Sequence, residues 1–225
     1  MLKAVIFDMD GVIINSEHVY QKVELEMAAS LGLQVSQEEL SQYTGIYMDI
    51  MWRELAQKYG LSIDIPLTVK KEEALMRDYY RSGELDVIPG SVELIKSLSG
   101  LGIRCAIATS SITESAQFVI SRLELAPYIR VLVSSSMVEN CKPSPDVFLK
   151  CIGKLNVEAD ACIAIEDSKS GCIAAKAAGI RVIAYGSPAS CGQDLSMADL
   201  IVDDMGKIDM EMLTGLLSRD ISHSD

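Results

Sequence analysis

Two acidic residues follow the first apolar segment of the chain. Residues 4–7 (Ala-Val-Ile-Phe) favour a strand, Asp8 and Asp10 come after it, and Gly11 follows them. A strand that is apolar on both faces belongs inside a parallel sheet, and such sheets bind ligands beyond the carboxyl ends of their strands. Two carboxylates this close repel each other unless a cation or a proton separates them, so the spacing favours a divalent-metal site. The same Asp-x-Asp-Gly tetrapeptide is also typical of a plain turn, and alone it decides little.

Hydroxyl groups follow a second apolar run, residues 104–108. Ser111 and Glu114 have the spacing of a helix capping box, and the free backbone N–H groups at a helix start can bind an anion. Simple capping remains an adequate explanation for Ser111. Thr109 is not needed as a cap and is the better candidate for a phosphate ligand.

A lysine and a second acid pair complete the chemically interesting residues. Lys142 precedes Pro143 in a segment whose two prolines restrict the backbone, as the fixing of an ammonium beside a phosphate requires. Ser144 is the predicted N-cap of the next helix. Glu166 and Asp167 follow an apolar run, as Asp8 does. Helix N-capping is the alternative reading of this pair.

The elements that position these residues alternate between strand and helix, which predicts an α/β fold with a parallel sheet and helices on both faces. Residues 15–86 interrupt this alternation with helical patterns alone, so we expect a core of residues 1–14 and 87–225 and an inserted helical domain of residues 15–86. Further strands are predicted at 104–109, 131–134, 162–166, 181–185 and 199–202, and helices at 19–31, 36 onward, 47–59, 67–80, 91–98, 112–122, 145–154, 169–178 and 207–218.

The amino-acid composition indicates which classes of binding partner to expect. The formal net charge of −12 argues against nucleic-acid or anionic-membrane partners, and we expect neither. No signal peptide or membrane span is evident, and the six cysteines show no metal-binding spacing, so we expect a cytoplasmic protein with reduced thiols. The apolar stripes are all accounted for by packing within the chain, which is compatible with a monomer.

Taken together, the four groups resemble the four motifs of the haloacid dehalogenase superfamily, and more narrowly its beta-phosphoglucomutase-like branch with a helical cap. The matching stretches are Asp8-Met-Asp-Gly11, Thr109-Ser110, Lys142-Pro143 and Ile165-Glu-Asp-Ser168, in the family's order, and the resemblance spans residues 1 to about 203. It implies a Rossmann-like core whose inserted cap, residues 15–86, sets substrate specificity. It also implies a cis peptide bond between Lys142 and Pro143.

The resemblance further implies a role for each residue. Asp8 is the expected nucleophile that forms an aspartyl-phosphate, and Asp10 the general acid and base. Thr109, the Ser110 amide and Lys142 are expected to bind the phosphoryl oxygens. The expected cofactor is Mg²⁺, with a carboxylate oxygen of Asp8, the backbone carbonyl of Asp10 and Asp167 as ligands and Glu166 in the first or second coordination shell.

The expected activity is a phosphatase acting on a small phosphorylated metabolite, with a sugar phosphate favoured. A mutase is the runner-up because Lys71 falls where the mutases carry a cap lysine. However, Met48 replaces an arginine of the mutases, Tyr20 replaces a histidine that His18 cannot supply, and Asn15 replaces the usual acid. A response-regulator receiver is a remote alternative, because such receivers have no helical insertion after the first strand, whereas this chain has one at residues 15–86. A non-catalytic binding protein is another, but no acid and no lysine of the motifs is missing.

Overall fold

The computed structural model describes residues 1–43, 48–83, 85–186 and 193–218, and the chain divides into two compact units. One unit combines Met1–Asn15 with Leu85–Asp225, and the other is Ser16–Glu84. Within the described residues, no helix combines the length and the apolar character needed to cross a membrane.

The first unit is built on a sheet of six parallel strands, which confirms the predicted fold class. The strands are β1 (Ala4–Phe7), β2 (Arg104–Ala108), β3 (Ile129–Val133), β4 (Cys162–Glu166), β5 (Arg181–Tyr185) and β6 (Leu200–Val202). Their order is β3-β2-β1-β4-β5-β6, so the chain runs outward from β1 to β3 and then returns to the other side of β1. The carboxyl ends of β1 and β4 therefore form the point where the direction of winding reverses, which is the usual ligand site of such sheets.

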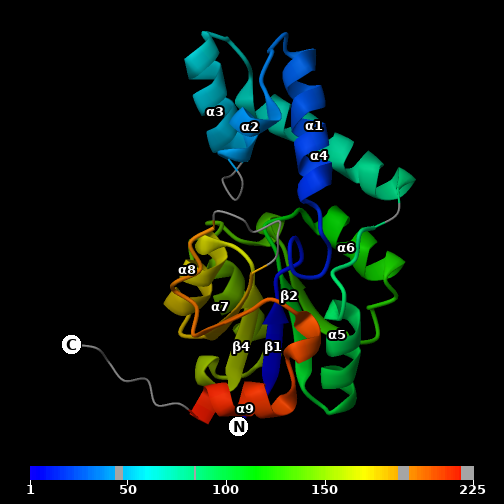
Figure 1. Cartoon of the computed structure of the whole chain (residues 1–225), viewed down its shortest axis with the longest axis vertical. Helices are drawn as coiled ribbons and strands as arrows, with labels where there is room; N and C mark the ends of the chain where they lie inside the picture. The colour runs from blue at the N-terminus through cyan, green and yellow to red at the C-terminus, as the bar shows by residue number, and fades with distance from the viewer. Residues whose placement is uncertain (44–47, 84, 187–192, 219–225) are drawn as a thin grey trace, which may run out of the picture. The chain divides into compact units, whose positions relative to one another are not determined.

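Helices cover both faces of this sheet (Figure 1). Side chains alternate between the faces, so Ala4 and Ile6 of β1 pack into one apolar cluster with residues of α7 (Asp146–Leu155) and α8 (Lys169–Ala177). On the opposite face lies α5 (Ser91–Gly100), where the Cys105 thiol is 3.6 Å from the Ile95 carbonyl oxygen. All four residues of β1 are buried, so this strand holds its position at the centre of the unit and fixes where Asp8 begins.

The remaining helices of this unit are α6 (Thr113–Arg122) and α9 (Met210–Ser218). The predicted starts of α7 and of the last helix are wrong. Ser144 does not cap α7, because Pro145 occupies the N-cap position and the Ser144 hydroxyl donates instead to Asp146 Oδ1 at 2.6 Å. The last helix begins at Met210 and not at residue 207, since Met205–Lys207 forms a 3-10 turn.

In its described part, the second unit contains helices and no strand. Its helices are α1 (Glu17–Ser30), α2 (Gln37–Ser41), α3 (Met48–Tyr59) and α4 (Ile65–Ser82). The Ser36 hydroxyl accepts the Glu39 N–H at 3.1 Å, which confirms the predicted cap of α2. Residue 47, the predicted start of the third helix, lies outside the described residues.

A buried acid lies at the centre of this helical unit. Glu72 is fully buried, its Oε2 accepts the Trp52 indole N–H at 2.5 Å, and its Oε1 has no hydrogen-bond partner among the described residues. Burial raises the pKa of Glu72 to about 7, with a smaller contribution from Glu73. Burial likewise raises the pKa of Glu24 on α1 to about 8, helped by Glu72 and Glu17. Both carboxyl groups therefore bind a proton more tightly in the folded unit than in the unfolded chain.

Candidate active site

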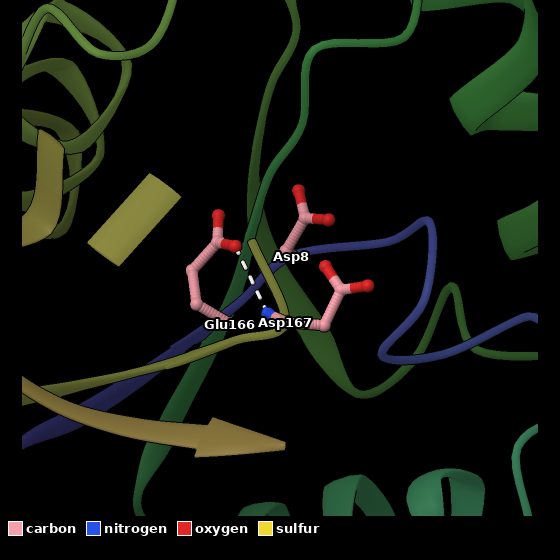
Figure 2. A group of neighbouring side chains, drawn as sticks. All are labelled: Asp8, Glu166 and Asp167. Atoms are coloured by element: carbon pink, nitrogen blue, oxygen red, sulfur yellow. Dashed lines mark hydrogen bonds between the residues drawn. The ribbon is translucent and has the colours of Figure 1, made fainter. Parts of the chain in front are cut away.

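The ends of β1 and β4 bring three carboxyl groups together. Asp8 follows β1, Glu166 is the last residue of β4, and Asp167 comes next; one oxygen of each lies within 4.8 Å of the others. All three point to the same side of the strand ends (Figure 2). The two strands pair in parallel with Phe7 opposite Ile165, so the register itself sets Asp8 beside Glu166. The structure thus brings together the three carboxyl groups that the family resemblance implied as neighbours of one metal.

Lys142 enters this cluster from the segment before α7. Its Nζ donates to Asp8 Oδ1 at 2.7 Å, to Glu166 Oε1 at 2.5 Å and to the Ala108 carbonyl oxygen at 3.0 Å. These three acceptors use all three hydrogens of the ammonium group. The peptide bond between Lys142 and Pro143 is cis, which confirms that prediction. Lys142 thus cross-links the ends of β1, β2 and β4.

The cluster holds three carboxyl groups and one ammonium group. Burial raises the pKa of Asp8 to about 8 despite Lys142, and Glu166 and Asp10 add to the rise. Loss of hydration and the same acidic neighbours hold the pKa of Asp167 well above its ordinary range. Burial alone lowers the pKa of Lys142, but Asp8 and Glu166 together hold it above its ordinary value. Three carboxyls around one ammonium, all offering hard oxygen donors, suit a small divalent cation such as Mg²⁺.

The Glu166 carboxylate is held on both of its oxygens. While Oε1 accepts from Lys142, Oε2 accepts from the Asp167 and Ser168 backbone N–H groups at 3.0 and 3.2 Å and from the Ser168 hydroxyl at 3.0 Å. The carboxylate rests directly on the backbone of Gly171, where a Cβ would come within 1.9 Å of Oε1. A glycine at this position is therefore a requirement of the site, and sequence reasoning did not single it out.

Gly11 leaves room for the Asp167 carboxylate in the same way. Its φ of +78° lies in the left-handed region, and a Cβ there would come within 1.9 Å of Asp167 Oδ2. The turn after β1 can therefore approach the end of β4 only with glycine at this position. The turn and the acid cluster are parts of one arrangement, and the plain-turn alternative for the first motif does not account for it.

Asp10 lies beside the end of β2. Its Oδ2 accepts the Ser111 hydroxyl at 2.6 Å and lies 3.5 Å from Thr109 Oγ1. The capping alternative for Ser111 does not hold, because Ile112 occupies the N-cap of α6 without a side-chain bond. The reason is tertiary: the loop after β1 brings a carboxylate within reach of a hydroxyl that a local cap would have used.

The other predicted ligands lie in different surroundings. Thr109 is buried, with its Oγ1 accepting the Ser111 N–H at 3.0 Å, while Ser110 is exposed. Lys71 belongs to the second unit, on α4, and its side chain is exposed. Met48 begins α3 and is half-buried. The phosphate-binding roles of Thr109, Ser110 and Lys71 stay predictions.

Comparison with known proteins agrees with this geometry. A family model described as haloacid dehalogenase-like hydrolase matches residues 5–185, a range that contains every motif at the strand ends. The chain belongs to this family. The match extends from β1 to β5 and so includes the whole acid cluster and the inserted helical unit.

Individual relatives of this hydrolase carry more specific names. It is 33% identical over 189 residues to "Phosphorylated carbohydrates phosphatase" of Thermotoga maritima, covering 82% of this chain and 85% of the relative. It is 31% identical over 194 residues to "Hexitol phosphatase B" of Escherichia coli (strain K12), covering 82% and 84%. A crystal structure of beta-phosphoglucomutase from Clostridium difficile has the same fold, with a TM-score of 0.81 at 22% identity over 96% of this chain and 97% of that one.

Proposed function

We propose that this hydrolase is a Mg²⁺-dependent phosphatase that acts on a small phosphorylated metabolite, with a sugar phosphate as its substrate class. The observation that carries the proposal is the cluster of buried Asp8, buried Glu166 and half-buried Asp167 with Lys142 at the carboxyl ends of β1 and β4. A carboxylate nucleophile, a neighbouring acid and a fixed ammonium are the groups that phosphoryl transfer needs.

In the proposed first step, an Asp8 oxygen attacks phosphorus while the bond to the leaving oxygen breaks. Asp10 gives its carboxyl proton to that oxygen, and the phosphoryl group remains on Asp8 as an aspartyl-phosphate. In the second step Asp10 takes a proton from water, whose oxygen attacks phosphorus and releases inorganic phosphate and Asp8. Lys142 holds Asp8 in place throughout and supplies positive charge beside it.

The donor set fits a metal. Asp8, Asp167 and the backbone carbonyl of Asp10 are the proposed ligands of Mg²⁺, with Glu166 beside them. When bound, the ion supplies positive charge, which favours the ionised form of Asp8 and offsets the negative charge of the incoming phosphate.

The substrate class rests on two supports. The phosphatases named above act on phosphorylated carbohydrates and hexitol phosphate by their names, and this chain is about equally similar to both. The helical unit also offers Lys71 as an exposed cation and an apolar Met48 where a mutase carries arginine. At the positions compared with the mutases Lys71 is the one cation retained, which suits a substrate with a single phosphate and water as the acceptor.

The experiment is a phosphate-release screen over sugar, hexitol and other small phosphate esters, with and without Mg²⁺. We expect Mg²⁺-dependent release that Asp8→Asn abolishes, with the variant folded as judged by circular dichroism. Near-normal turnover by Asp8→Asn contradicts the covalent route. Absence of release from every ester contradicts the phosphatase proposal.

A second assay separates a phosphatase from a mutase. The protein is incubated with β-glucose 1-phosphate and a trace of the 1,6-bisphosphate. The phosphatase proposal predicts free phosphate from esters without accumulation of glucose 6-phosphate. Rapid formation of glucose 6-phosphate with little free phosphate would overturn it in favour of the mutase.

A further inference from the structure

Ser111 makes a short contact to Asp10. Its hydroxyl donates to Asp10 Oδ2 at 2.6 Å, whereas Thr109 Oγ1, at 3.5 Å, lies at the limit of a hydrogen bond. We propose that Ser111 is a positioning residue that holds the Asp10 carboxyl group where it transfers a proton to the leaving oxygen. This inference rests on the proposed function, since it assigns a partner to the proposed acid.

The backbone of Ser111 is fixed on both sides. Its N–H donates to Thr109 Oγ1 at 3.0 Å, and its carbonyl oxygen accepts from the Ser135 N–H at 3.2 Å and the Ser135 hydroxyl at 3.1 Å. The residue is 8% exposed. Its hydroxyl is therefore presented to Asp10 from a backbone held at the ends of β2 and β3, as a supporting residue of a catalytic group requires.

Helix capping does not compete for the Ser111 hydroxyl. A serine at this point of the sequence usually caps the following helix, but α6 has Ile112 at its N-cap and no side-chain bond there. The Ser111 hydroxyl donates to the side chain of Asp10, 101 residues away in sequence. Loss of this hydroxyl removes no helix cap and costs the fold one hydrogen bond, so its main effect should appear in the chemistry.

Asp10 needs such a partner because of its position. It lies in the turn beyond β1, outside the regular sheet, and is only partly buried. A general acid must stay within hydrogen-bond reach of the oxygen it protonates, and a side chain that samples several rotamers loses that geometry. Protonation matters most when the leaving oxygen is strongly basic, and little when it leaves readily as an anion.

This dependence on the leaving group supplies the test. Phenyl phosphate and p-nitrophenyl phosphate have similar shapes, but phenolate is the poorer leaving group, and kcat/KM reports the steps through departure of the phenol. We expect Ser111→Ala to raise the ratio of kcat/KM for p-nitrophenyl phosphate over phenyl phosphate by about tenfold or more, a part of the ~10²–10⁴-fold that a general acid supplies. The thermal midpoint should fall by no more than a few degrees, the cost of one lost hydrogen bond in a chain of this size. An unchanged ratio, whether both rates fall together or neither falls, overturns the proposal.

Two further comparisons serve as controls. Ser111→Thr and Ser111→Val are nearly equal in size and differ in the hydroxyl, so the wild-type ratio should return in the first and not in the second; equal ratios in these two variants overturn the proposal even if Ser111→Ala does not fold. In an Asp10→Asn background, Ser111→Ala should cause no further change in the ratio, and an additional change overturns it. A wild-type protein that releases phosphate from no ester, aryl or sugar, with Mg²⁺ contradicts the proposed function itself. An active wild type whose ratio responds to Asp10→Asn but not to Ser111→Ala contradicts this inference alone.

Discussion

Replacing Gly171 by alanine has two opposing effects on stability, one from the helix preference of the backbone and one from packing. Gly171 lies in the first turn of α8, where glycine to alanine ordinarily stabilises a helix by about 1 kcal/mol. Here the new Cβ would lie 1.9 Å from Glu166 Oε1 and 2.0 Å from its Cδ, well inside contact distance. The carboxylate must move away, which breaks its bond to the buried Lys142 ammonium and costs about 3–5 kcal/mol when a buried pair is separated. The packing cost exceeds the gain in helix preference, so the variant should lose about 2–4 kcal/mol of unfolding free energy.

Thermal unfolding measures this loss. For a chain of this size a loss of about 2–4 kcal/mol lowers the midpoint by roughly 4–16 °C. Gly153→Ala is the matched control, because Gly153 lies inside α7 and a Cβ at this position would meet nothing within 4 Å, so the change should raise the midpoint slightly. Phosphate release should fall in Gly171→Ala and stay unchanged in the control. A Gly171→Ala protein as stable as Gly153→Ala would refute the packing argument.

Other perturbations test the charges of the two units. Lys142→Met leaves two buried carboxylates without their shared cation, so we expect loss of phosphate release and a decrease in unfolding free energy of about 3–5 kcal/mol in urea titrations. Added Mg²⁺ should raise the thermal midpoint of the wild type and not that of Asp167→Asn, and removal of Mg²⁺ with a chelator should stop phosphate release; a midpoint shift of equal size in the variant argues against Asp167 as a ligand. Because the pKa of Glu72 rises from 4.5 to about 7 on folding, the folded unit binds its proton more tightly, and its stability should fall by about 3 kcal/mol as pH rises from 4.5 through 7. Glu72→Gln should flatten this decrease, followed by fluorescence of Trp52, the chain's single tryptophan; an unchanged slope contradicts the assignment.

The parts of the site that sequence reasoning found share one physical basis. Asp8 and Glu166 each follow an apolar run, and in a parallel sheet the carboxyl ends of all such runs meet at one edge. Knowing the fold class was therefore enough to predict that they are neighbours. Lys142 was found for a different reason, since two prolines marked its segment as stiff.

The parts that were missed depend on contacts between distant segments. A serine hydroxyl gains similar free energy from capping a helix or from binding a carboxylate, so Ser111 could be assigned only once the position of Asp10 was known. Gly171 and Gly153 look alike in the sequence, both as glycines within predicted helices. They differ only in what faces them, a buried carboxylate in one case and open space in the other.

The charges of the site also explain why its residues must act as a group. Asp8 and Glu166 share the ammonium group of Lys142, which already donates all three of its hydrogens, and the Asp167 carboxyl group lies beside them. A phosphate ester adds further negative charge to this cluster. Its binding therefore requires a cation to arrive before it or with it, and a contact from Lys142 to the phosphate requires exchange of one of the bonds that Lys142 now makes. The predicted contact of Lys142 with the phosphate is therefore compatible with its bond to Asp8 only at the expense of its bond to Glu166 or to the Ala108 carbonyl oxygen.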